Sequence, residues 1–166
     1  MSEQQSAVKE AKRRLYQYIH LQFELYRQCE RLARLKSAEK FPSRPEGNEG
    51  GGTGQPNPHR QENAIVRRME YESKMNVRVA EITAELDAID DAIDSLPDAL
   101  EREILRLRYT DGENNRLKEW TEIALDLYGD NDEKHLAATY RLHGRALVNI
   151  ATIFNEVNNN GKSEFE

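Results

Sequence analysis

The chain has little of what membrane and secreted proteins depend on. Its 166 residues include one cysteine, Cys29, and only 7% aromatic residues, and the mean hydropathy is −0.88. A single cysteine excludes an internal disulfide and is typical of a reducing compartment. No apolar run approaches the roughly 18–20 residues that a transmembrane helix needs. The first residues, MSEQQSAVKEAKRR, also lack the apolar core of a signal peptide, so we expect a cytoplasmic protein with no membrane partner.

Glycine and proline are scarce as well, and most of them lie in one segment. Residues 42–58 contain five of the nine glycines and four of the five prolines. Such a composition cannot support a packed core, so it predicts a flexible linker over residues 42–60. The polar residues 158–166 are predicted to form a disordered tail.

The remaining sequence has the periodicity of helices, and no segment alternates as a strand does. Residues 1–41 are predicted to form one long helix and residues 61–96 a second. The apolar stripe of the first helix comprises Val8, Ala11, Leu15, Tyr18, Ile19, Leu25, Tyr26, Cys29 and Leu32. The second helix carries a strict 4-3 heptad stripe, which comprises Met75, Val79, Ile82, Leu86, Ile89, Ile93 and Leu96.

The two long segments also differ in charge. Residues 1–40 hold nine Lys/Arg against five Asp/Glu, whereas residues 61–96 hold four Lys/Arg against nine Asp/Glu. Similar lengths, opposite charges and a linker that can reverse direction predict a long antiparallel helical hairpin. The basic face of residues 9–40 either follows DNA or pairs with acidic residues of the second helix, and we favour the pairing. The available acids are Glu81, Glu85, Asp87, Asp90, Asp91 and Asp94.

Residues 97–157 are predicted to form a helix-turn-helix bundle. Pro97 suits the first position of a helix that continues to about residue 110. The residues expected to face inward on this helix are Leu100, Ile104 and Leu107. A short helix over residues 119–128 ends at Gly129, and a longer helix over residues 133–157 follows. The predicted fold class is therefore all-α, with the hairpin followed by a C-terminal helix-turn-helix bundle.

The C-terminal sequence resembles the fourth region of sigma-70-type transcription factors. The matching residues are Leu96-Pro97, Leu107-Arg108-Tyr109, Gly112, Glu122-Ile123-Ala124 and Ala146-Leu147. Together with the hairpin and the linker, the segment 141–147 is similar to a narrower group, the phage and prophage late-gene activators of the RinA and ArpU type. The resemblance implies a DNA-binding transcriptional regulator, an activator of phage or prophage late genes, in a bacterial host cell.

The resemblance also implies which residues contact double-stranded DNA. The positions that read bases in the family fall on Leu136, Ala137, Tyr140 and Arg141. The candidate DNA-binding residues are Lys134, Tyr140, Arg141 and Arg145 on the last helix, and Arg116 and Lys118 in the preceding turn. An arginine at position 141 suits guanine contacts, and one at position 145 suits phosphate. One such unit makes few base contacts, so a homodimer is expected, with host RNA polymerase as a further partner.

Two alternative functions remain open on the sequence alone. Residues 97–154 hold eight Lys/Arg against eleven Asp/Glu, and the last helix begins beside Asp130, Asp132 and Glu133. This acidity favours a helical adaptor that contacts RNA polymerase or another phage protein without binding DNA. A DNA-packaging accessory protein is the other alternative, because small terminase subunits also combine helix-turn-helix units with helical hairpins.

No motif predicts catalysis, a metal, a cofactor or a small-molecule substrate. His135 and His143 are eight residues apart, which is about 12 Å of helical rise and too far for one ion. Asp130-Asn131-Asp132 begins like a calcium loop, but Lys134 follows where a third ligand is needed. The Gly-rich segment lacks the Gly-Lys-Ser/Thr ending of a phosphate loop. We therefore do not expect an enzyme.

Overall fold

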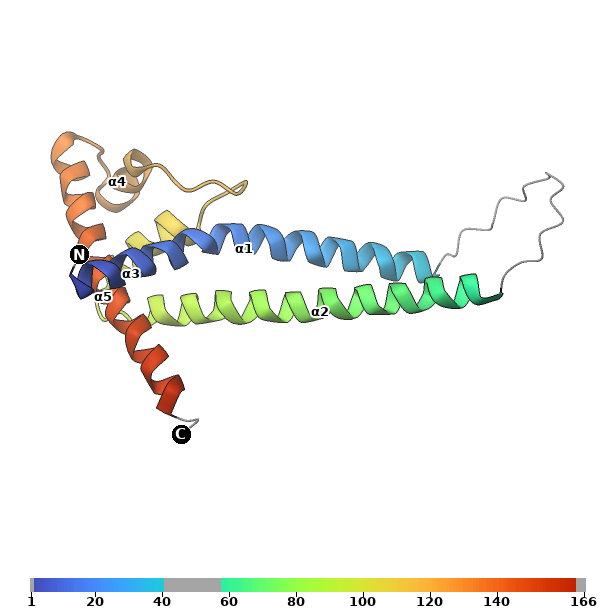
Figure 1. Ribbon diagram of the computed structural model, residues 1–166. Helices are drawn as coiled ribbons and strands as arrows, with labels where there is room; N and C mark the ends of the chain where they lie inside the picture. The colour runs from blue at the N-terminus through green and yellow to red at the C-terminus, as the bar shows by residue number, and fades with distance from the viewer. Residues whose placement is uncertain (1, 41–57, 164–166) are drawn as a thin grey trace. The chain divides into compact units, whose positions relative to one another are not determined.

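The computed structural model describes residues 2–40 and 58–163, and every regular element in these ranges is helical. The chain is therefore all-α, as predicted. The elements are α1 (Glu3–Lys40), α2 (Pro58–Asp94), α3 (Ala99–Leu105), the π-helical turn η1 (Arg106–Thr110), α4 (Trp120–Tyr128) and α5 (Glu133–Ser163), as Figure 1 shows. Within these ranges, no helix has the length and apolar character needed to cross a bilayer.

The helices pack as two compact units. The bundle unit comprises Met1–Phe23 and Ala84–Glu166, and the paired-helix unit comprises Glu24–Thr83. Each long helix therefore contributes one part to each unit. This division differs from the predicted one, in which residues 1–41 and 61–96 were separate from residues 97–157. The reason is that the first turns of α1 and the last turns of α2 pack with the helices that follow them.

The element boundaries also differ from the predicted ones. The predicted linker covers residues 42–60, but α2 begins at Pro58, and residues 42–57 lie outside the described ranges. The predicted tail begins at residue 158, but α5 continues to Ser163, and residues 164–166 are again outside the description. Three consecutive asparagines have low helix propensity, yet no proline follows them to end the helix.

The heptad stripe predicted for α2 forms the seam in both units. In the bundle unit, the stripe residues Leu86, Ile89, Ile93 and Leu96 are all 7% exposed or less. In the paired-helix unit, Met75 and Ile82 are buried and Val79 is half-buried. The stripe prediction is therefore confirmed.

The stripe predicted for α1 is confirmed in part. Ala11, Leu15, Tyr18, Ile19 and Leu32 are buried. In contrast, Tyr26 is 65% exposed and Cys29 is exposed, so their assignment to the stripe was wrong. Both residues belong to the paired-helix unit, whose described residues form two helical segments. A two-helix seam buries a narrow stripe, and side chains one position to either side point to solvent.

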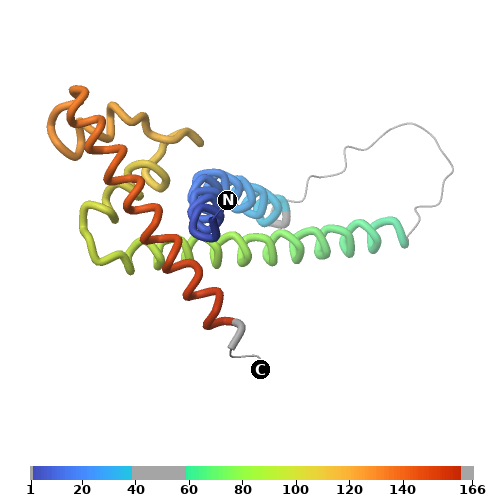
Figure 2. The backbone as a smooth tube through the Cα atoms, turned by 60° about the vertical axis from the view of Figure 1, so that its left-hand side comes forward, coloured from blue at the N-terminus to red at the C-terminus, as the bar shows by residue number. Residues whose placement is uncertain are grey.

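The two segments of the paired-helix unit run antiparallel, as Figures 1 and 2 show. Glu24 pairs with Arg78 at 2.7 Å, and further along α1 the Leu35 carbonyl oxygen accepts a hydrogen bond from Arg68. A later residue of α1 thus contacts an earlier residue of α2, as expected for antiparallel helices. The Glu24–Arg78 pair also has the acid on α1 and the base on α2, opposite to the predicted arrangement.

Among the described residues of the bundle unit, the charge pairing predicted between the long helices occurs at one place. Arg14 of α1 and Glu85 of α2 lie 3.0 Å apart. Asp90 and Asp94 of α2 instead pair with Arg106 of η1, and the Tyr18 hydroxyl donates to Asp90 at 2.9 Å. Several other bases of α1 pair with acids of their own helix, as in Arg13–Glu10, Arg27–Glu30 and Arg34–Glu30.

The helix predicted from Pro97 to about residue 110 is divided into α3 and η1. Asp98 begins α3 by accepting a hydrogen bond from the Leu100 backbone N–H at 2.8 Å. Leu100 is 49% exposed, whereas Glu101 is 2% exposed, so the prediction of an inward Leu100 was wrong. The cause is the pair of partners that α5 provides for the Glu101 carboxylate, described below.

The seam of the bundle unit provides a test of the packing. Leu86 is 7% exposed, so Leu86→Ala should lower the free energy of unfolding by roughly 2–4 kcal/mol, because the cavity cannot fully collapse. Leu100→Ala, at a site that is 49% exposed, is the matched control and should cost about 0.5 kcal/mol or less. Urea denaturation measures both. Equal costs for the two leucines would contradict the seam.

Candidate nucleic-acid interface

Helices α4 and α5 and the residues between them form the helix-turn-helix. At the start of α4, the Glu119 backbone N–H donates to the Glu122 carboxylate at 3.1 Å. Gly129 ends α4 with a φ of 72°, a left-handed conformation that glycine adopts without strain. Asp132 then caps α5 by accepting a hydrogen bond from the His135 backbone N–H at 2.8 Å. The predicted turn and the two helices are thus fixed by local chemistry.

One face of α5 is buried and the other is open to solvent. The inner face packs against α3 and α4 and comprises Thr139, Leu142, His143, Ala146, Leu147 and Ile150. The outer face comprises Lys134, Ala137, Arg141 and Gly144, which are all exposed. Residues at spacings of three, four and seven share a helix face, which explains why these side chains lie together.

Three of the six predicted contact residues meet on this outer face or at its edge. Arg141 is exposed and has no ion-pair or hydrogen-bond partner among the described residues. Lys134 lies two turns earlier and is also exposed. The Tyr140 side chain is 52% exposed at the edge of the face, and its ring centroid lies 5.2 Å from that of Trp120. Arg141 is therefore available to an external anion.

Arg145 has partners within the bundle unit. Its Nε donates to Glu101 Oε1 at 2.8 Å, and its Nη2 lies 3.5 Å from Asp98 Oδ2. Asn149 donates to the other oxygen of Glu101 at 2.8 Å. Both oxygens of a carboxylate that is 2% exposed are thus satisfied from α5. The Arg145 side chain remains 60% exposed, but its charge is balanced by two acids.

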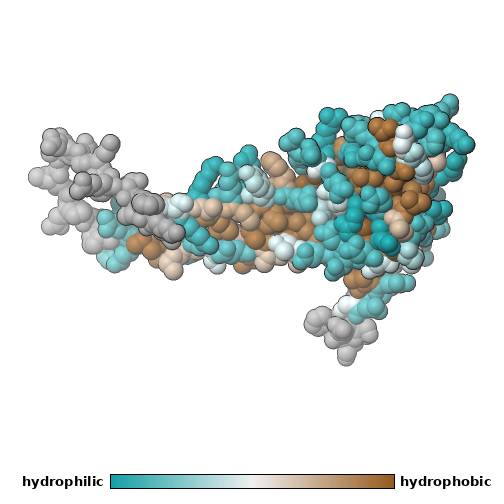
Figure 3. Space-filling model, turned by 180° about the vertical axis from the view of Figure 1, so that it is seen from behind, coloured by the Kyte–Doolittle hydropathy of each residue, from teal (hydrophilic) through white to brown (hydrophobic). Residues whose placement is uncertain are grey.

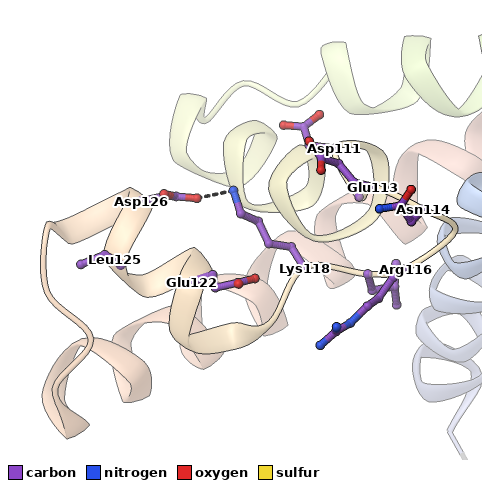
Figure 4. A pocket seen from close by; sticks show the side chains of 10 residues that line it. Asp111, Glu113, Asn114, Arg116, Lys118, Glu122, Leu125 and Asp126 are labelled. Carbon is purple, nitrogen blue, oxygen red and sulfur yellow. Dashed lines mark ion pairs between the residues drawn. The ribbon is translucent and has the colours of Figure 1, made fainter.

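Arg116 and Lys118 also have acidic partners. Lys118 pairs with Asp126 of α4, which raises the pKa of Lys118, and Arg116 lies 3.2 Å from Glu119. The two cations line a cleft of about 530 Å³. Figure 4 shows their side chains among the others that line it. The acids lining this cleft are Asp111, Glu113, Glu122 and Asp126. Because the acids outnumber the bases, this cleft does not favour phosphate.

The loop that carries these two cations has a defined backbone shape. Asn114 and Asn115 have φ values of 55° and 59°, in the left-handed region that asparagine tolerates better than most residues. At Gly112, a Cβ atom would overlap the Arg116 carbonyl oxygen and the Ile19 side chain. The backbone of residues 112–116 is therefore held in one shape by close contacts with Ile19 and within the loop itself.

A cluster of rings lies behind the outer face of α5, and the sequence patterns did not predict it. The Arg108 guanidinium lies 4.4 Å from the centroid of the Trp120 ring, and the same ring lies 4.7 Å from that of His143. The Tyr109 hydroxyl and His143 Nε2 share a buried hydrogen bond of 2.8 Å. Burial, with nearby Lys12 and Arg108, lowers the pKa of His143 to about 4, and burial raises the pKa of Tyr109.

The turn before α5 brings three potential metal ligands together. Ligand atoms of Asp130, Asp132 and His135 lie within 4.8 Å of one another. Asp132 Oδ1 already accepts from the His135 backbone and lies 2.5 Å from its ring nitrogen. Helix capping, which also lowers the pKa of Asp132, therefore accounts for this cluster.

Comparisons with protein-family models, with curated proteins and with solved structures found no match for this chain.

The Arg145–Glu101 pair predicts a structural effect that Arg141 does not share. Arg145→Ala leaves a buried carboxylate with Asn149 as its remaining close partner, and should lower the free energy of unfolding by about 1–3 kcal/mol. Arg141→Ala, on the same helix, is the matched control and should change it by about 0.5 kcal/mol or less. Denaturant titration of both variants measures the difference. A neutral Arg145→Ala would contradict a stabilising role for the pair.

The buried His143 predicts a loss of stability in mild acid. Its pKa lies at about 4 in the folded chain and 6.5 in the unfolded chain, so the unfolded chain takes up the proton first as the pH falls. Between pH 7.5 and 4.5 this group should cost about 2–3 kcal/mol of unfolding free energy. His143→Gln should remove that part of the pH dependence. Parallel pH profiles for the two proteins would show that His143 is not the cause.

Proposed function

We propose that the protein is a DNA-binding transcriptional regulator that docks the outer face of α5 in the major groove. The observation that carries this proposal is Arg141, an exposed guanidinium on the outer face of a helix-turn-helix that has no ion-pair or hydrogen-bond partner within residues 2–40 and 58–163. Two parallel N–H groups of an arginine match the O6 and N7 acceptors of guanine. In this proposal Lys134, two turns earlier on the same exposed face, contacts a phosphate.

The phage setting is part of the same proposal. It is supported by the resemblance of residues 96–147 to the fourth region of sigma-70-type factors and to the late-gene activators of phages and prophages. In this proposal the protein activates late genes by binding DNA beside the host RNA polymerase. Because one helix-turn-helix offers few base contacts, two copies would bind two half-sites related by their symmetry axis.

An adaptor that binds protein instead of DNA is the second candidate, and three ion pairs favour it. Arg145, Arg116 and Lys118 all have carboxylate partners in the bundle unit. Each of these cations would have to leave its partner, or share it, to contact a phosphate. The acids at the start of α5 also oppose a phosphate backbone there. In this alternative, the acidic bundle contacts RNA polymerase or another phage protein.

Arg141→Ala tests the DNA interface. A selection on random or phage-genome fragments first identifies a bound sequence. On that sequence the variant should lose about 1–3 kcal/mol of binding free energy and lose preference at one base position. Fluorescence anisotropy at several salt concentrations measures both effects.

Arg67→Ala is the matched control for this experiment. Arg67 is an exposed arginine in the paired-helix unit, so its loss should leave DNA affinity unchanged. If the wild-type protein retains no DNA of any sequence at low salt, where electrostatic attraction is strongest, the DNA proposal fails and the adaptor replaces it.

A further inference from the structure

Helix α2 carries a second apolar face in the paired-helix unit, apart from the seam. Ile65, Val66, Met69 and Val77 are 58%, 51%, 65% and 57% exposed. Ser73, at the middle of this face, and Met75, on the seam, are two residues apart, which places them about 200° apart around the helix. The exposed face therefore points away from α1, and Figure 3 shows apolar side chains on the surface of the long helices.

This face is hollowed at its centre. A groove of about 520 Å³ is lined by Met69, Glu72, Ser73, Asn76, Val77 and Ala80. The small Ser73 side chain leaves the space between the larger Met69 and Val77, which lie one turn to either side of it. Apolar walls around a small residue allow another helix to approach closely.

The sizes of the side chains are unequal along the face. Three large side chains, Ile65, Val66 and Met69, lie on the N-terminal side of Ser73, and one, Val77, lies on the C-terminal side, where it faces Met69 of the other copy if the helices are antiparallel. The small Ala80 lies seven residues to its C-terminal side, as far from Ser73 as Val66 is in the other direction. Two such faces fit best when antiparallel, because Val66 of each copy then lies over Ala80 of the other.

The charged residues beside the groove can also pair with those of a second chain when the two α2 helices run antiparallel. Glu70 and Lys74 lie on one edge of the apolar face, and neither has an ion-pair partner among the described residues. A two-fold axis perpendicular to two antiparallel helices brings the same edge of each helix together. Near Ser73, Glu70 of one copy then lies opposite Lys74 of the other, and the reverse contact forms as well.

We infer that the exposed face of α2 binds the same face of a second copy of the chain, with the two helices antiparallel and crossing near Ser73. This inference rests on the dimer of the proposed function and identifies its surface. The occupant is a second copy because the size pattern and the Glu70–Lys74 pair are both self-complementary.

A charge exchange in the full-length protein tests the pairing. Lys74→Glu places like charges opposite each other and should weaken self-association by about tenfold at low salt, as should Glu70→Lys. A mixture of the two variants should restore the wild-type dissociation constant, because both cross-pairs are then attractive. Analytical ultracentrifugation measures association, and circular dichroism checks that the helices are intact.

Cross-linking tests the orientation. In a Cys29→Ser background, Val66→Cys mixed with Ala80→Cys should form a mixed disulfide dimer on oxidation, whereas each variant alone should not. Arg67→Cys mixed with Ala80→Cys is the control, since position 67 is turned about 100° from position 66. Cross-linking of Val66→Cys with itself would indicate parallel helices and would overturn the inference.

The outcomes separate this inference from the proposed function. A monomeric wild-type chain, or a dimer that neither charge variant weakens, overturns the inference and assigns the face to another occupant. A dimer that cross-links as expected but binds no DNA contradicts the DNA proposal alone. A monomer that binds its selected sequence overturns the inference and the two-copy binding mode, but leaves the proposed DNA contact of α5 in place.

Discussion

The bundle unit depends on one buried carboxylate. Glu101 is 2% exposed, and a charge at that depth is destabilising unless both oxygens are paired. Arg145 and Asn149, one turn apart on α5, provide the two partners at 2.8 Å each. Their positions fix the rotation of α5 about its own axis. Arg141, one turn before Arg145, consequently points to solvent. Glu101 of α3 therefore determines the direction in which the proposed contact residue points.

Periodicity predicted the parts of the fold that packing alone decides. The stripe from Met75 to Leu96, which runs along α2 and just past its end, follows the heptad rule because its residues share a continuous seam. The same rule failed at Tyr26 and Cys29, where two helices meet without a third to widen the buried stripe. It failed again at α3, where Leu100 and Glu101 exchanged their expected places. The partners that draw Glu101 inward are 44 and 48 residues away in the chain, which a local pattern cannot detect.

The positions of the candidate site residues on α5 could be predicted from the sequence, but the ion pairs that some of the candidate cations form could not. Helical spacing alone places Lys134 and Arg141 on one outward face of α5, and the structure agrees. Counting charges by segment could not show that Arg145, Arg116 and Lys118 are already paired, because their acids come from α3, a loop and α4. The hydrogen bond between Tyr109 and His143 was equally hidden, since nothing in either local sequence indicates the other.

Trp120 is the only tryptophan of the chain, and its surroundings make it an internal optical probe. Its ring contacts His143 on the buried side and Tyr140, which is 52% exposed, on the side nearer solvent. Indole emission depends on the charge and polarity of the groups against the ring. The intrinsic fluorescence of the protein therefore reports protonation inside the bundle and occupation of the outer face of α5 from a single position, without any attached label.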